Sequence, residues 1–207
     1  MSTTRETMSG ESQNSSPPVS ATPAFGDPGG LGLGAFALTT FVLSMANSGF
    51  IVGAGVSVLG LALFYGGIAQ FVAGIWEFAN KNTFGATAFC SYGAFWLAFW
   101  FLVVSKGDVG AGSAGVGIFL IAWGIFTLYM TFAAIKTTGA ILAVFAFLTL
   151  TFFALGIGAM TGVVGITHLG GYLGIITAIL AWYGSFATVI NSTFKRVVLP
   201  VWPAKQV

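Results

Sequence analysis

Few side chains in this sequence could carry acid–base, nucleophilic or metal chemistry. His168 is the single histidine and Cys90 the single cysteine, which excludes a cysteine-based metal cluster and an intramolecular disulfide. The glycine-rich stretch that begins at Gly30 lacks the Lys-Ser/Thr pair of a phosphate-binding loop. We therefore expect no enzyme, no cofactor and no metal site. The net charge of +2 is also too small for nucleic-acid binding.

Glu77 is the acidic residue that lies closest to the interior of an apolar segment, and two interpretations of it stay open. An intramembrane carboxylate is by default functional, and here it could accept the proton of a proton-coupled carrier. A glutamate near a helix end could instead pair with Lys81, which follows it by one helical turn.

The chain that carries these residues is too apolar to fold as a globule in water. Only 6% of its residues are charged and 57% are hydrophobic, whereas an ordinary soluble domain has about 25% charged residues. The charge-free runs are long enough for helices of roughly 20 residues, the length that crosses a bilayer. They divide into six expected spans, at residues 33–54, 57–78, 84–104, 115–134, 138–159 and 169–193.

These spans predict an all-α membrane protein with both termini in the cytoplasm. The runs show no apolar–polar alternation, as strands of a membrane barrel would, and backbone in lipid must satisfy its own hydrogen bonds. With six spans, both termini share one side with the loops that carry Lys81 and Lys136. Six of the seven cations fall on that side and only Lys106 on the other, so the positive-inside rule makes it the cytoplasmic side.

The two ends of the chain differ in composition from the spans. Residues 1–26 are rich in Ser, Thr and Pro, which predicts a disordered cytoplasmic tail. Residues 27–195 are expected to form the six-helix transmembrane domain, and residues 196–207 a short cytoplasmic tail.

Uncharged polar side chains inside the spans indicate what such a bundle could carry. A pathway lined by hydroxyls and amides suits a small, weakly held solute, either a monocarboxylate or a neutral amide. The residues that could line it are Thr39, Thr40, Asn47 and Gln70. The two threonines could equally bond to their own helix, and the two amides could hold helices together.

The most specific pattern lies in residues 64–96. It reads Phe64-Tyr-Gly-Gly-Ile-Ala-Gln70-Phe-Val-Ala-Gly-Ile-Trp-Glu77 and continues through Asn82-Thr-Phe-Gly-Ala-Thr-Ala-Phe-Cys-Ser-Tyr92-Gly-Ala-Phe-Trp96. This pattern closely resembles the acetate uptake transporter family, which includes the bacterial succinate–acetate permeases. That family also carries Asn-Pro-Ala-Pro-Leu-Gly-Leu before its first helix, where this chain has Asp27-Pro28-Gly29-Gly30-Leu31-Gly32-Leu33. At this entrance, the anionic Asp27 in place of the asparagine would repel acetate.

The resemblance implies a homohexamer in the plasma (inner) membrane, with a pore for acetate and related small monocarboxylates, and for succinate in some members, through each protomer. It also implies a hydrophobic constriction of Phe, Tyr and Leu, which correspond here to Phe36, Tyr92 and Leu148. Phe36 reaches the depth of the other two only if residues 27–33 already enter the bundle, and we expect them to do so as irregular backbone. Passive flux and proton coupling both stay open, and a channel for a small neutral solute, an amide or ammonia, is the alternative.

Overall fold

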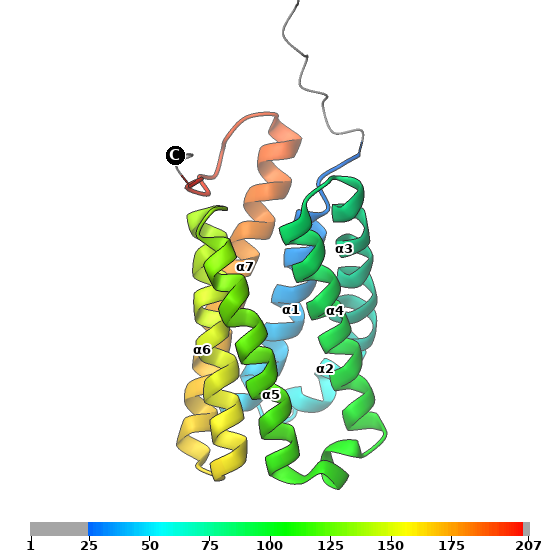
Figure 1. The fold of residues 1–207 in the computed structure, drawn as a ribbon, viewed down its shortest axis with the longest axis vertical. Coiled ribbons are helices and arrows are strands. Elements are labelled where there is room, and N and C mark those ends of the chain that lie inside the picture. The colour runs from blue at the N-terminus through cyan, green and yellow to red at the C-terminus, as the bar shows by residue number, and fades with distance from the viewer. Residues whose placement is uncertain (1–24, 205–207) are drawn as a thin grey trace, which may run out of the picture.

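The computed structural model describes residues 25–204, and within them it has six helices long and apolar enough to cross a membrane (Figure 1). The all-helical architecture and the six spans predicted from the sequence are thus confirmed. Of the predicted N-terminal tail, residues 1–24 lie outside the described residues. Residues 205–207 of the predicted C-terminal tail also lie outside them. The first span is α1 (Gly29–Asn47), and the second joins α2 (Ala54–Leu63), η1 (Phe64–Ala69) and α3 (Gln70–Ala79). The remaining spans are α4 (Thr83–Val104), α5 (Gly107–Ala134), α6 (Gly139–Thr161) and α7 (Val164–Phe194).

The first helix lies nearer the N-terminus than the apolar run predicts. It begins at Gly29, directly after Pro28, and ends at Asn47 rather than at residue 54. Proline is tolerated here because the first turn of a helix has no internal partner for its N–H groups. The segment from residue 27 to residue 33 therefore enters the bundle mostly as helix, not as the irregular backbone that we expected. At the other end the chain turns at Gly49, whose φ is 80°.

A π-helical segment, η1, interrupts the second span. Such wide turns are rare and occur frequently at functional sites. Gly66 lies in η1 and faces Thr39 of α1, where an added Cβ would come within 2.6 Å of the threonine hydroxyl. The absence of a side chain at Gly66 lets α1 and η1 approach closely. The next residue after η1 is Gln70, which is completely buried.

The first and last spans, α1 and α7, pack against each other along their length. Gly174 faces Ser44, Gly171 faces the backbone of Ser48, and the Ser185 hydroxyl donates a hydrogen bond of 2.6 Å to the carbonyl oxygen of Gly30. Small residues allow this approach, as is usual where helices meet in a membrane. The α1–α7 seam therefore joins residues that are far apart in the sequence.

We expect Gly171→Ala to destabilise the bundle because the new methyl group would meet backbone rather than a movable side chain. An ideal Cβ at Gly171 lies 2.5 Å from the Ser48 Cα and 2.6 Å from the Asn47 carbonyl carbon. Overpacking a well-filled interior costs about 1–3 kcal/mol. The melting temperature of the detergent-solubilised protein should fall clearly. The matched control is Gly165→Ala on the same helix, where a Cβ meets nothing within 4 Å; equal melting temperatures for the two variants would contradict the close packing.

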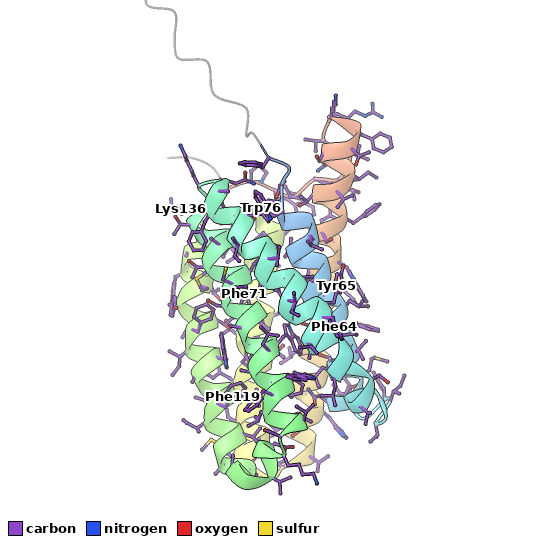
Figure 2. The ribbon with its side chains drawn as sticks, turned by 90° about the vertical axis from the view of Figure 1, so that its right-hand side faces the viewer. Phe64, Tyr65, Phe71, Trp76, Phe119 and Lys136 are labelled. Carbon is purple, nitrogen blue, oxygen red and sulfur yellow. The ribbon has the colours of Figure 1, made fainter. Side chains whose placement is uncertain are left out.

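Beyond α7, residues 196–204 fold back across the helix ends. The amide of Gly139 donates to the carbonyl of Trp202 at 2.8 Å, and Ala204 donates to Thr137 at 2.8 Å. The Tyr183 hydroxyl donates to the Pro200 carbonyl at 2.6 Å. Both ends of the described chain thus lie at one end of the bundle, which we call the terminal side (Figure 1). Trp76 and Lys136 lie at the same end (Figure 2).

Candidate functional site

In the part of the chain that the structure describes, two cavities lie inside the bundle, one toward each end. The terminal-side cavity has a volume of about 270 Å³, and Asp27, Glu77 and Thr188 are among its lining residues. The distal cavity has a volume of about 310 Å³, and its lining includes Asn47 and Thr167. Phe36 and Leu148 line both cavities. These two side chains therefore form the wall between the cavities.

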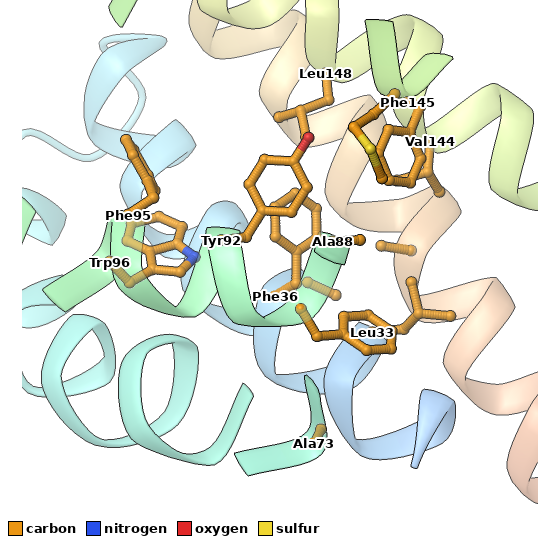
Figure 3. Close-up of a cluster of buried hydrophobic side chains, with 14 of the residues drawn as sticks. Leu33, Phe36, Ala73, Ala88, Tyr92, Phe95, Trp96, Val144, Phe145 and Leu148 are labelled. Carbon is orange, nitrogen blue, oxygen red and sulfur yellow. The ribbon is translucent and has the colours of Figure 1, made fainter. Parts of the chain in front are cut away.

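Tyr92 completes this wall, so the structure brings the three predicted constriction residues together. Its ring lies 5.6 Å from the ring of Phe36, measured between centroids, and it lines the terminal-side cavity. Leu148 extends toward the Tyr92 ring (Figure 3). The Tyr92 hydroxyl donates a hydrogen bond of 3.0 Å to the Thr127 hydroxyl. Because this bond holds the hydroxyl, the ring has a defined orientation.

Helix caps place two of the predicted constriction residues at a similar depth. Asn82 caps α4 by accepting from the Gly85 amide, and Thr138 caps α6 by accepting from the Ile141 amide. Tyr92 follows the first cap and Leu148 follows the second by the same ten positions (92 − 82 and 148 − 138), which is about 15 Å of helix. Both side chains therefore lie at a similar depth, and the early start of α1 brings Phe36 to the same layer.

Two carboxylates converge at the mouth of the terminal-side cavity. Glu77 is only 3% exposed, and its Oε2 accepts a hydrogen bond of 2.9 Å from the side-chain amide of Asn82. A Cβ placed on Gly29 would lie 2.9 Å from the Asp27 Oδ1 and 3.7 Å from the Glu77 Oε1. The structure thus gives Glu77 an amide partner at the N-cap of α4 instead of the Lys81 partner considered from the sequence. The glycine at position 29 leaves room for the Asp27 carboxylate.

The other predicted pathway residues fall into two groups. Thr40 and Asn47 line the distal cavity. Thr39 and Gln70 line neither cavity, and the Thr39 hydroxyl donates to the Ala35 carbonyl at 2.8 Å. Thr39 therefore bonds back onto its own helix, which was the alternative open from the sequence.

The predicted entrance motif is divided between the cavity and the packing of α1. Asp27 and Leu33 line the terminal-side cavity. Gly30 and Gly32 face Val189 and the Phe89 ring. Leu31 points outward and is 45% exposed, and Pro28 precedes the helix.

Several polar residues of the distal cavity were not among the residues that we selected from the sequence. Trp96, Ser44 and Thr151 line this cavity. Trp96 lies within a run of aromatic residues, and such a run by itself suggests packing. The signal that could have identified it is its position four residues after Tyr92, which places both side chains on one face of α4.

Comparison with known proteins shows which sequences and structures this chain is similar to. Residues 9–206 match the model of the GPR1/FUN34/yaaH family. The chain is 40% identical over 178 residues to the succinate–acetate/proton symporter SatP of Escherichia coli, covering 84% of this chain and 94% of that protein. It is 43% identical over 180 residues to ammonia transport outward protein 2 of Saccharomyces cerevisiae, covering 80% of this chain and 62% of that protein.

Among solved structures, that of the bacterial acetate channel SatP superimposes with a TM-score of 0.80. The two chains are 38% identical, and the match covers 86% of this chain and 99% of the other. The chain spans slightly less than two thirds of the length of the first yeast relatives, 66% and 62%. The fold and the helix order are thus those of a known membrane channel.

Proposed function

The chain belongs to the GPR1/FUN34/yaaH family, and from that premise we propose that it carries acetate and related small monocarboxylates across the plasma membrane. Relatives named as a succinate–acetate/proton symporter and as an acetate permease support this substrate class, as does the likeness to an acetate channel. The solute passes through a pore within each protomer.

The single observation that carries the proposal is the pair of cavities that share Phe36 and Leu148 as a wall. Together the cavities extend from the terminal-side mouth at Glu77 to the distal residues Asn47 and Asp108. A thin apolar wall between two wider chambers rejects water-bound ions by dewetting, while a small solute that sheds part of its hydration passes. Acetate is a small solute of this kind, and it has a short apolar tail.

We further propose that the terminal side faces the cytoplasm and that protomers assemble as a hexamer. The first statement rests on the excess of cations at that side. The second is supported by the large apolar side chains that the described part of the chain leaves exposed along α2 to α3, among them Phe64, Ile75 and Phe78 (Figure 2). Lipid and neighbouring protomers would cover such a surface.

Transport of ammonia is the second candidate, because one relative is named as an ammonia transport protein. The carboxylates of Asp27 and Glu77 at the terminal-side mouth would attract ammonium and repel acetate, so the flux measurements below are designed to separate the two solutes.

The test is uptake of labelled acetate into proteoliposomes, with and without an inward proton gradient at fixed acetate-anion concentration. We expect wild-type uptake above that of empty liposomes. Leu148→Trp should block it, because the larger ring fills the wall between the cavities. Ile157→Trp is the matched control, since Ile157 lies on the same helix but is 44% exposed on its outer face.

Each possible result of this uptake experiment leads to a different conclusion. Uptake that Leu148→Trp abolishes and Ile157→Trp preserves supports a carboxylate pore at this position. Uptake equal to that of empty liposomes, combined with rapid methylammonium flux, would replace acetate by the ammonia reading. A dependence of wild-type uptake on the proton gradient would identify symport, and its absence passive flux.

A further inference from the structure

Thr127 of α5 is completely buried and lines neither cavity, yet it is the partner of a constriction residue. Its hydroxyl accepts the hydrogen bond of 3.0 Å from the hydroxyl of Tyr92 on α4. Within the described chain this is the one side-chain hydrogen bond that joins α4 to α5. Thr127 is therefore out of reach of a solute in either cavity, and it can influence the pore only through Tyr92.

The direction of this hydrogen bond is fixed by the helix that carries Thr127. The Thr127 hydroxyl has a single proton, and it donates that proton to the carbonyl oxygen of Trp123 at 2.7 Å. Such a bond to the carbonyl four residues earlier is common for a threonine inside a helix. Tyr92 must therefore be the donor toward Thr127. The Thr127 side chain is held by its own helix, and it in turn holds the Tyr92 hydroxyl.

The aromatic rings around Tyr92 divide into two groups, according to whether they line a cavity. Phe36 and Phe145 lie 5.6 and 6.0 Å from the Tyr92 ring, measured between centroids, and both line the terminal-side cavity. Phe126 and Trp123 of α5 lie 5.5 and 6.2 Å from the same ring and line neither cavity. The hydroxyl, which points away from α4 (Figure 3), bonds to α5 as well. The polar end of the ring is thus anchored on the helix of the second group, outside the cavity linings.

We propose that Thr127 is a positioning residue that keeps the passage open by holding the Tyr92 ring toward α5. This inference rests on the proposed function and adds a residue that sets the width of the constriction without touching the solute. The surrounding rings hold Tyr92 by packing, and the hydrogen bond supplies the directional restraint on its hydroxyl. Without the Thr127 acceptor, this buried hydroxyl would be left unpaired, which is costly.

The terminal-side cavity is the place where a released Tyr92 hydroxyl would find new partners. Tyr92 lines this cavity, whose volume of about 270 Å³ is enough to hold water. Asn82, Thr137 and Thr138 add polar groups to the same lining. A ring freed from Thr127 would therefore turn its hydroxyl toward the cavity. The turned ring would take up part of the passage and slow the flux of the solute.

The first test measures acetate flux in proteoliposomes for three variants. Thr127→Val keeps the shape of the side chain and removes the acceptor. It should lower maximal flux at least about fivefold, with a smaller change in the half-saturating acetate concentration, because turned rings reduce the number of open pores. Thr127→Ser keeps the hydroxyl and should restore most of the flux. Adding Tyr92→Phe to Thr127→Val should also raise the flux above that of Thr127→Val alone, since phenylalanine has no hydroxyl that needs a partner.

The orientation of the ring can also be followed without any flux, by 19F NMR of the full-length protein labelled with 3-fluorotyrosine. The chain has five tyrosines, and the signal that disappears in Tyr92→Phe belongs to Tyr92. We expect this signal to shift in Thr127→Val and to return to its wild-type position in Thr127→Ser. Tyr183 is the reference, because it stacks on Trp202 with ring centroids 5.9 Å apart and lines neither cavity; its signal should stay in place.

The matched control is Thr131→Val on the same helix. The Thr131 hydroxyl lies 3.0 Å from that of Thr149 on α6, and Thr131 lines neither cavity. This variant therefore removes a pair of hydroxyls between two helices while the bond of Tyr92 stays intact. Its flux and its Tyr92 signal should stay near the wild-type values. Equal losses of flux in the two valine variants would mean that Thr127 only stabilises the bundle.

The failure of this inference is distinguishable from failure of the proposed function. Wild-type flux in Thr127→Val, together with an unmoved Tyr92 signal, overturns the positioning role. A double variant that carries no more flux than Thr127→Val overturns it as well, because the Tyr92 hydroxyl would then not be the cause of the loss. Absence of acetate flux from the wild-type protein would instead reject the proposed function, and the Tyr92 signal would still decide whether Thr127 positions the ring.

Discussion

Leu148→Ala is expected to let succinate through at a rate that approaches that of acetate. Leu148 is 3% exposed and forms, with Phe36, the wall shared by the two cavities. Shortening it to alanine removes most of the side chain from that wall. The cavities on either side, of about 310 and 270 Å³, already have room for a four-carbon dicarboxylate.

The effect should be larger for succinate than for acetate because the two solutes differ in length and charge. A hydrophobic constriction acts by making hydrated charge costly, and succinate brings a second carboxylate through it. We expect the ratio of acetate to succinate uptake to fall about tenfold, a difference of about 1.4 kcal/mol between the two barriers. Phe36→Ala should act in the same direction, but it also removes the contact with the Tyr92 ring, which will lower stability.

The matched control is Leu142→Ala, on the same helix. Leu142 is partly buried against the core and lines neither cavity, so this variant reports the cost of a leucine truncation in α6 alone. Both variants should be compared by uptake of labelled acetate and succinate in the same proteoliposome preparation. An unchanged acetate-to-succinate ratio in Leu148→Ala would remove the three-residue constriction from the mechanism.

Glu77→Gln should abolish any acceleration of acetate uptake by an inward proton gradient while leaving gradient-independent uptake in place. We propose Glu77 for this role because it is buried, lines the terminal-side cavity and uses only one oxygen on Asn82. Buried acids in membrane spans mark ion and proton pathways. Glutamine has nearly the same shape, and it cannot take up a proton in the physiological range.

Asp27→Asn is the variant with which Glu77→Gln should be compared. Asp27 lies beside Glu77 at the same mouth, on the segment before α1, and its removal should raise uptake of the anion by weakening electrostatic repulsion. The gain should be about two- to fivefold at low ionic strength and should fade in high salt, where the Debye length shortens to a few ångströms. Its dependence on the proton gradient should persist. If Glu77→Gln keeps that dependence as well, Glu77 has a structural role only.

The number of spans followed from the sequence because charged turns near Lys81, Lys106 and Lys136 separate some spans, and glycine-rich stretches divide the two longest charge-free runs. Helix ends followed less well, since apolar residues also occupy the turns. The predicted first span ran to residue 54, but Phe50, Ile51 and Val52 lie beyond Asn47, after the turn at Gly49. Hydropathy does not register a left-handed glycine, and the π-helical turn of η1 has no compositional signal either.

The residues of the candidate site also divide into those that the sequence could predict and those that it could not. Phe36, Tyr92 and Leu148 were accessible through a motif, and the helix caps bring them to one depth. Adjacent threonines were not separable, because Thr39 and Thr40 differ only by a rotation of about 100° around the helix. Only the packing of α1 against η1 and the shape of the cavity show that Thr40, and not Thr39, lines the distal cavity. Trp96 was missed because an indole in an aromatic run carries no sign of whether its N–H is satisfied.

The seam between α1 and α7 also has a consequence for how the protein is made. Ser44 of α1 and Ser48, which directly follows this helix, face glycines of α7, the last of the six described spans to leave the ribosome. Until then this small-residue surface stays open to lipid or to the insertion machinery. Chains that stop before α7 therefore leave this surface of the first helix uncovered.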